Sequence, residues 1–330
     1  MFFNRIMLFN KQPFFYSFLF AIIVWISWGL YTFPKGMTYI LNNWQVSITM
    51  VFGSFVAGAT SEGGGAIAFP VFTKLLKISP FDAKVFSLAI QSVGMLAASI
   101  TIRVLRVKVS GKVIVWASLG GVPGVVCGAV ILSPILAPEM LRLVFTVMVV
   151  SLAMTLWVLN RGYRLYNNTI PNTGYREYAI LVLAGFVGGL LTGLVGNGID
   201  IFCFSVMILL FRLSEKIATP TSVVLMALNS IVGFMLHLFY MGGFNPQVQE
   251  YWLSAVPIVV VGAPLGAWVC SRMNNKTIAN FLILLIVIEL ISTLWILKFS
   301  NILILTALAA FIFFIGLNYL MIKSKLYCVS

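Results

Sequence analysis

Two short glycine-rich stretches carry residue types that could bind an ion inside an apolar environment. The first, Gly58 to Pro70, reads GATSEGGGAIAFP and holds one carboxylate, Glu62, followed by three consecutive glycines. The second, Gly193 to Ser205, reads GLVGNGIDIFCFS and begins 135 residues later in the chain. Glycine lets a ligand approach the backbone closely, and the free N–H groups at a helix N-terminus attract anions. The pattern therefore predicts a site for a small anion.

The predicted binding residues of this site cluster at the two interruptions of the apolar sequence. They are Ser61, Glu62, Gly63, Gly64 and Gly65 in the first stretch and Asn197, Gly198 and Asp200 in the second. A buried carboxylate is costly unless it is paired, hydrated or protonated. Glu62 therefore lines a pathway in one interpretation and is a protonated carboxyl capping nearby N–H groups in the other. For Asp200 the alternative to a binding role is that its side chain caps the N-terminus of a helix. For Glu289, which lies in the middle of a span, the alternative is that it pairs with another helix.

Glu62 also creates a conflict, because an ionised carboxylate repels an anion. Protonation of Glu62 removes the repulsion, and we therefore expect proton binding at Glu62 to be coupled to substrate binding.

Polar residues in the following apolar segments extend the predicted site: Ser87, Gln91, Ser222 and Asn229. Ser87 and Gln91 are four residues apart and share one helix face. These side chains donate to substrate oxygens in one interpretation and form ordinary interhelical hydrogen bonds in the other.

An internal repeat relates the two stretches. At the same offset Gly53 matches Gly188 and Phe69 matches Phe204, and Glu62 is matched by Asn197. We expect repeat 1 at 46–160, a cytoplasmic linker at 161–177 and repeat 2 at 178–297. An extra helix lies at each end, in 1–45 and 298–330. Each repeat has five membrane segments and starts with a short broken helix pair, so an odd number of crossings makes the two repeats inverted.

The composition requires a lipid environment. Hydrophobic residues make up 61% of the 330 and charged residues only 9%, which is too little polar surface to cover a soluble globule. The fold class expected is an all-α polytopic membrane protein. The net charge of +13 comes from Lys and Arg between apolar spans, where basic residues set topology. It predicts both termini on the cytoplasmic side of the cytoplasmic membrane, with no nucleic-acid partner.

The sequence contains no residue pattern that is typical of an enzyme active site. No Ser/His/Asp set, phosphate-binding loop or pair of metal ligands occurs, and the four cysteines stand singly. The sequence thus predicts a protein that is not an enzyme and needs no cofactor or metal. Its expected partners are a small anion and the lipid bilayer.

The glycine motifs resemble those of the sulfite exporter TauE/SafE family of membrane permeases. Its members carry two copies of a G-x-x-x-G-L-x-G-I-G-G-G segment, each followed by an apolar stretch and a Thr-Ser-rich helix. Here GATSEGGGAIAFP precedes FSLAIQS, and GLVGNGIDIFCFS precedes PTSVVLMALNSIVG. The chain departs from the motif at Glu62, where an apolar residue is usual, and at Ile199 and Asp200, where glycines are usual.

The resemblance implies a secondary transporter of sulfite, an organosulfonate or a related sulfur oxyanion. No nucleotide-binding motif is present, so an ion gradient or the substrate's own gradient would drive transport. Two alternatives stay open at this point: an anion channel with two glycine-rich constrictions, and a membrane-embedded assembly partner that transports nothing.

Overall fold

A computed structural model describes residues 12–64, 68, 71–162, 164–171, 173–296 and 300–324. Helices dominate this part of the chain, and no strand beyond one isolated bridge occurs in it. Nine of the described helices are long and apolar enough to cross a membrane. The expected all-α polytopic membrane fold is confirmed.

The membrane-spanning helices follow one another in the predicted order. They are α2 (Gln12–Thr32), α6 (Pro80–Val104), α7 (Gly111–Val126) together with the π-helical turn that follows it, α8 (Pro138–Asn160), α9 (Tyr175–Val195), α11 (Glu215–Phe239), α12 (Pro246–Arg272), α13 (Asn275–Ile296) and α14 (Asn301–Lys323). Shorter elements are α3 (Gly36–Asn42), α4 (Trp44–Ala59) and α10 (Ile199–Ser205), with π-helical turns η1 (Val71–Leu75), η2 (Cys127–Leu132) and η3 (Val206–Leu210).

The short segments are undersized as the sequence predicts. Helix α4 has 16 residues, which at about 1.5 Å each span roughly 24 Å, less than a hydrocarbon core of about 30 Å. Helix α10 continues into η3 and ends at Leu210. Helix α4 ends at Ala59 and α10 begins at Ile199, and both residues are buried, so protein surrounds the interrupted ends.

Helix α3 lies in the connection between α2 and α4. This short helix packs on α2 and α12. Gly36, at the start of α3, sits directly against Trp28 and Thr32. The chain therefore folds back along α2 before it enters α4.

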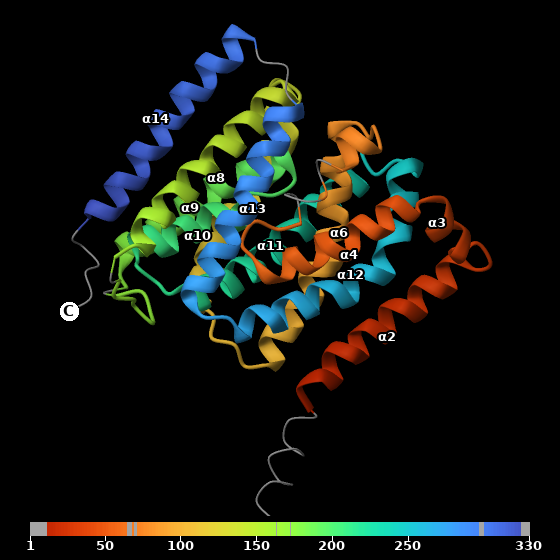
Figure 1. Cartoon of the computed structure of the whole chain (residues 1–330). Helices are drawn as coiled ribbons and strands as arrows, with labels where there is room; N and C mark the ends of the chain where they lie inside the picture. The colour runs from red at the N-terminus through yellow and green to blue at the C-terminus, as the bar shows by residue number, and fades with distance from the viewer. Residues whose placement is uncertain are drawn as a thin grey trace, which may run out of the picture.

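The outside of the bundle is apolar. Leu30, Phe239 and Ile302 are 78%, 79% and 77% exposed, a pattern that water would penalise and acyl chains would favour. Figure 1 shows α2 and α14 on opposite flanks of the bundle. Helix α2 packs mainly on α6 and α12, and α14 packs mainly on α8, so neither builds the centre.

Two helix crossings hold the centre together, α4 against α12 and α7 against α9. Glycine sets both distances. A Cβ on Gly128 of η2, directly after α7, would strike the carbonyl of Leu190, and a Cβ on Gly266 of α12 would strike that of Phe55. Small residues let helix backbones approach this closely. Each crossing joins a helix of 46–160 to one of 178–297, so the two regions are interlocked.

Candidate functional site

The first interruption begins where α4 ends. Thr60 caps the helix, and Ser61 and Glu62 follow with 1% and 0% of their surface exposed. Gly63 then adopts φ +71°, a conformation that other residues disfavour. The glycine turns the chain while the bundle still surrounds it, and so leaves Glu62 enclosed in protein.

The second interruption lies between α9 and α10. Gly198 has φ +151°, and the residues on either side of it are held by local hydrogen bonds. The Asp200 carboxylate oxygen Oδ1 accepts from the N–H groups of Gly198 at 3.1 Å and Ile201 at 3.0 Å. Asp200 is completely buried, and its other oxygen, Oδ2, has no donor among the described residues.

The two interruptions touch each other. The Asn197 side-chain amide donates to the backbone carbonyl of Glu62 at 3.2 Å. A side-chain atom added to Gly63 would lie 3.3 Å from Asp200 Oδ2. Residues predicted to form one site from stretches far apart in the chain are therefore adjacent in space.

A central cavity opens beside this contact. Its walls come from α4, α6, α8, α12 and α13, and Gly64, Ser87, Gln91 and Asn197 of the predicted site line it. About 40 Å³ is open to the centres of water molecules, where one water needs roughly 10–15 Å³. The cavity can thus hold a few waters or a comparably small polar species.

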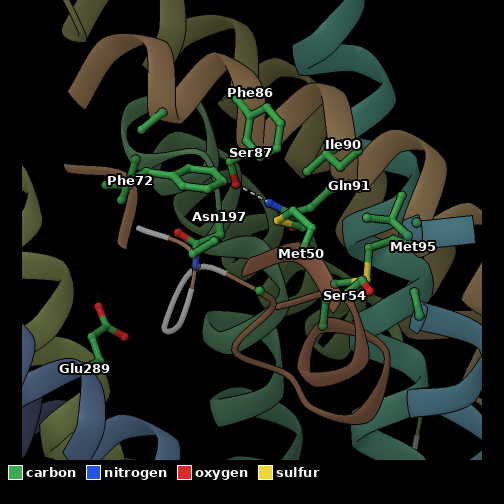
Figure 2. A pocket seen from close by; sticks show the side chains of 18 of the residues that line it. Met50, Ser54, Phe72, Phe86, Ser87, Ile90, Gln91, Met95, Asn197 and Glu289 are labelled. Atoms are coloured by element: carbon green, nitrogen blue, oxygen red, sulfur yellow. Dashed lines mark hydrogen bonds between the residues drawn. The ribbon is translucent and has the colours of Figure 1, made fainter. Parts of the chain in front are cut away.

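The polar wall on α6 is ordered by hydrogen bonds to the second interruption. Gln91 Nε2 donates to the Gly196 carbonyl at 3.1 Å and to Ser87 Oγ at 2.5 Å. The Ser87 hydroxyl also reaches the Gly196 carbonyl, at 3.4 Å. Figure 2 shows the Ser87–Gln91 bond with Asn197 beside it. Because a carbonyl can only accept, the Gln91 amide orientation is fixed, with Oε1 turned away from Gly196.

Charged side chains reach the same cavity from two further helices. Arg142 of α8 is 6% exposed and Glu289 of α13 is 3% exposed, and both line the cavity. Glu289 interacts electrostatically with Arg142 and also with Glu62. Its Oε1 accepts from the Thr146 hydroxyl at 3.4 Å. The pairing of Glu289 with another helix is therefore observed, and it occurs at the cavity.

Arg142 is the residue that sequence reasoning overlooked. Arg142 lies inside α8 and not between apolar spans, so the topology interpretation of the basic residues does not account for it. A guanidinium within a membrane segment is costly and usually faces a functional cavity. That signal is readable in the sequence.

Other predicted residues lie away from the cavity wall. Ser222 donates to the Thr219 carbonyl at 2.8 Å, and Asn229 donates to the Leu225 carbonyl at 2.8 Å. Both are completely buried, and neither lines the cavity. Gly198 does not line the cavity either, and its backbone N–H donates to Asp200 Oδ1. Gly65 lies outside the described residues.

A second, larger cavity of about 560 Å³ lies beyond the α4–α12 crossing. Lys108, Arg164 and Lys216 line it, and Arg164 forms an ion pair with Glu215 at 2.9 Å. We call this second cavity the basic vestibule. Gly58 and Ala267 line it, whereas the neighbouring Ala57 and Ala263 line the central cavity. The crossing is thus the partition between the two spaces.

The described residues contain no cluster of three or more His, Cys, Asp or Glu side chains arranged to hold a metal ion. What the central cavity offers instead is one guanidinium, several hydrogen-bond donors and a set of nearby carboxyl groups. Such a set can bind a small oxyanion through charge-assisted hydrogen bonds.

Fold and site together define a polytopic membrane protein with an enclosed, charged cavity at two broken helices. A family model described as "Sulfite exporter TauE/SafE" matches residues 46–293. The chain belongs to this family of membrane transporters, as the glycine motifs suggested.

A relative with a related description also matches part of the chain. It is the probable membrane transporter protein YunE of Bacillus subtilis, 30% identical over 118 residues. That match covers 36% of this chain and 42% of the relative, so the chain spans less than half of the relative's length. No solved structure matches the chain.

Proposed function

We propose that the protein is a secondary transporter that carries a small anion through the central cavity. The substrate class is sulfite, an organosulfonate or a related sulfur oxyanion. The protein lies in the cytoplasmic membrane with both termini in the cytoplasm, and its two inverted repeats meet at the cavity. The observation that supports this most strongly is the buried guanidinium of Arg142 in the cavity wall.

Arg142 has the chemistry that an oxyanion requires. A guanidinium presents a planar fork of N–H donors that matches two oxygens at once and stays charged. The amide and hydroxyl groups of Asn197 and Ser87 line the same cavity and add neutral donors. Family membership supports sulfur oxyanions as the substrate class.

Charge balance supports coupling to protons. Three buried carboxyl groups, Glu62, Asp200 and Glu289, lie close enough to interact electrostatically, and Glu289 also interacts with Arg142 in the cavity wall. An anion would meet a surplus of negative charge if all three were ionised. Glu62 is the group best suited to carry a proton, because neither of its carboxyl oxygens has a donor in the described part of the chain. Protonation of Glu62 would remove one negative charge from this region and so favour entry of the substrate anion.

The decisive experiment is uptake of radiolabelled sulfite or a taurine-like sulfonate into proteoliposomes, with and without a pH gradient. We expect saturable uptake that rises as the external pH falls, because the neutral form of Glu62 favours the anion. A Glu62→Gln variant, permanently neutral at this position, should transport with a weaker dependence on pH. Transport by that variant that stayed as pH-dependent as the parent's would contradict the coupling.

Flux and current recordings on the reconstituted protein separate the alternatives. Saturation and exchange across the membrane characterise a carrier, whereas large unitary currents would establish an anion channel. No flux of any anion in a broad panel, from protein shown to be folded, would leave the assembly partner as the function.

A further inference from the structure

Two hydrogen-bond acceptors face the same point beside Gly63, and neither has a donor among the described residues. The position that a Cβ on Gly63 would take lies 3.3 Å from Asp200 Oδ2 and 3.5 Å from Gln91 Oε1. Both oxygens are buried and unsatisfied, and Gln91 as a whole is only 5% exposed. Buried acceptors without a donor are costly, so something positive is expected between them.

The orientation of Gln91 is not adjustable. Its Nε2 already donates to the Gly196 carbonyl, and turning the amide over would place two acceptors against each other there. Oε1 must therefore remain directed at the space beside Gly63. Gln91 cannot supply the missing donor.

Backbone donors already occupy Oδ1 of Asp200, which leaves Oδ2 available to a cation. Two backbone N–H groups donate to its Oδ1, and such bonds stabilise the carboxylate. Glu62 has no comparable donors in the described chain. The two carboxyl groups are thus equipped for different partners, Glu62 for a proton and Asp200 for a metal cation.

We propose that Asp200 Oδ2 and Gln91 Oε1 bind a sodium ion in the space beside Gly63, with water from the cavity completing its shell. Hard cations prefer oxygen ligands, and sodium or proton sites in transporters commonly lie where membrane helices are broken. One carboxylate and one neutral amide oxygen suit a monovalent ion. Gly63 leaves the space open, because any side chain there would fill it.

The site extends the proposed transport function by naming a coupling ion. The ion would offset part of the negative charge around Arg142, so sodium and the substrate anion would bind cooperatively. The groups that face the site from the neighbouring elements are Glu62, through its charge on Asp200, and Glu289 and Arg142 beyond it.

Binding can be tested without transport. Purified full-length protein is heated in detergent at fixed pH and chloride while choline is replaced by sodium or potassium. Ligand binding to the folded state raises the melting temperature as the ligand saturates its site. We expect a saturable rise with sodium, a smaller one with potassium, and loss of the sodium effect in Asp200→Asn and Gln91→Leu.

Matched variants keep the test decisive. Asn318→Ala removes a buried amide that bonds Ser151 and Thr155 on α8, and it should retain the sodium response. If Gln91→Leu does not fold, Gln91→Glu tests the same point, since a second carboxylate should tighten sodium binding several-fold. Equal effects of sodium and choline on the parent, or a sodium response that survives in Asp200→Asn, would overturn the proposal.

Flux measurements distinguish failure of this site from failure of the transport function. Anion uptake that is saturable but indifferent to sodium, together with no sodium binding, would leave the transporter and remove the sodium site. Sodium binding with no anion flux would leave the site and remove the transporter.

Discussion

Asn197 donates its side-chain amide to the backbone carbonyl of Glu62 at 3.2 Å, and the two residues hold equivalent positions in the two glycine-rich stretches. Each broken helix therefore forms part of the other's surroundings. A hydrogen bond of this kind is worth about 0.5–1.5 kcal/mol net, enough to align the two breaks without locking them. A shift of either break should therefore displace the other.

Replacement of Arg142 should weaken anion binding. Arg142→Gln removes the charged fork from the cavity wall, and a hydrogen bond to a charged group is worth about 1.5–3 kcal/mol. We expect the apparent KM for sulfite uptake to rise by about ten-fold or more. Arg142→Lys should recover part of the affinity, because it keeps the charge and loses the bidentate geometry.

Arg176→Gln is the matched control for Arg142, since Arg176 is exposed in the first turn of α9. Its uptake should equal the parent's. An unchanged KM in correctly folded Arg142→Gln protein would remove Arg142 from the binding site.

Ser87 and Ser222 are a second matched pair, 135 residues apart in sequence. Ser87 lines the cavity and bonds Gln91, whereas Ser222 is completely buried with its hydroxyl on the Thr219 carbonyl. Ser87→Ala should raise the KM for the anion roughly three- to ten-fold, the equivalent of one neutral hydrogen bond. Ser222→Ala should transport like the parent, and equal losses in both variants would contradict the assignment of the cavity.

The α4–α12 crossing should not tolerate a single added methyl group. A Cβ on Gly266 would meet the carbonyl of Phe55 and lie 3.0 Å from the Ala59 nitrogen. Overpacking of this kind costs about 1–3 kcal/mol, so Gly266→Ala should lower the melting temperature in detergent. Gly316→Ala on α14 is the control, because no atom lies within 4 Å of its added Cβ. Equal melting temperatures would show that the crossing can relax.

A disulfide across the same crossing tests whether it moves. The Cβ position at Gly262 lies 3.2 Å from the Ser54 Cβ, close to the roughly 3.5–4.5 Å that a disulfide needs. In a background without native cysteines, Ser54→Cys with Gly262→Cys should cross-link on oxidation. We expect oxidation to stop anion flux and reduction to restore it, because the crossing separates the central cavity from the basic vestibule. Full flux in completely oxidised protein would show that transport leaves this partition in place.

Much of the architecture follows from the sequence alone. The apolar runs become helices, because in lipid a segment must satisfy its own backbone hydrogen bonds. The glycine breaks could be located for the same reason: Glu62, Asn197 and Asp200 interrupt runs that are otherwise apolar. The family resemblance is carried by these breaks and is therefore readable in the sequence.

Tertiary structure decided which polar residues meet. Ser87 and Ser222 are indistinguishable by type and by position after a glycine break, yet only Ser87 lines the cavity. In the sequence, Arg142 resembles a basic residue that sets membrane topology, and Glu289 resembles an isolated carboxylate in the middle of a helix. In the structure, α8 and α13 place both side chains at the cavity wall. The sequence by itself determined that the chain spans a membrane and where its helices break, since both depend on local hydropathy and backbone geometry. Only the packing of distant helices, which no local pattern encodes, decided what surrounds the breaks.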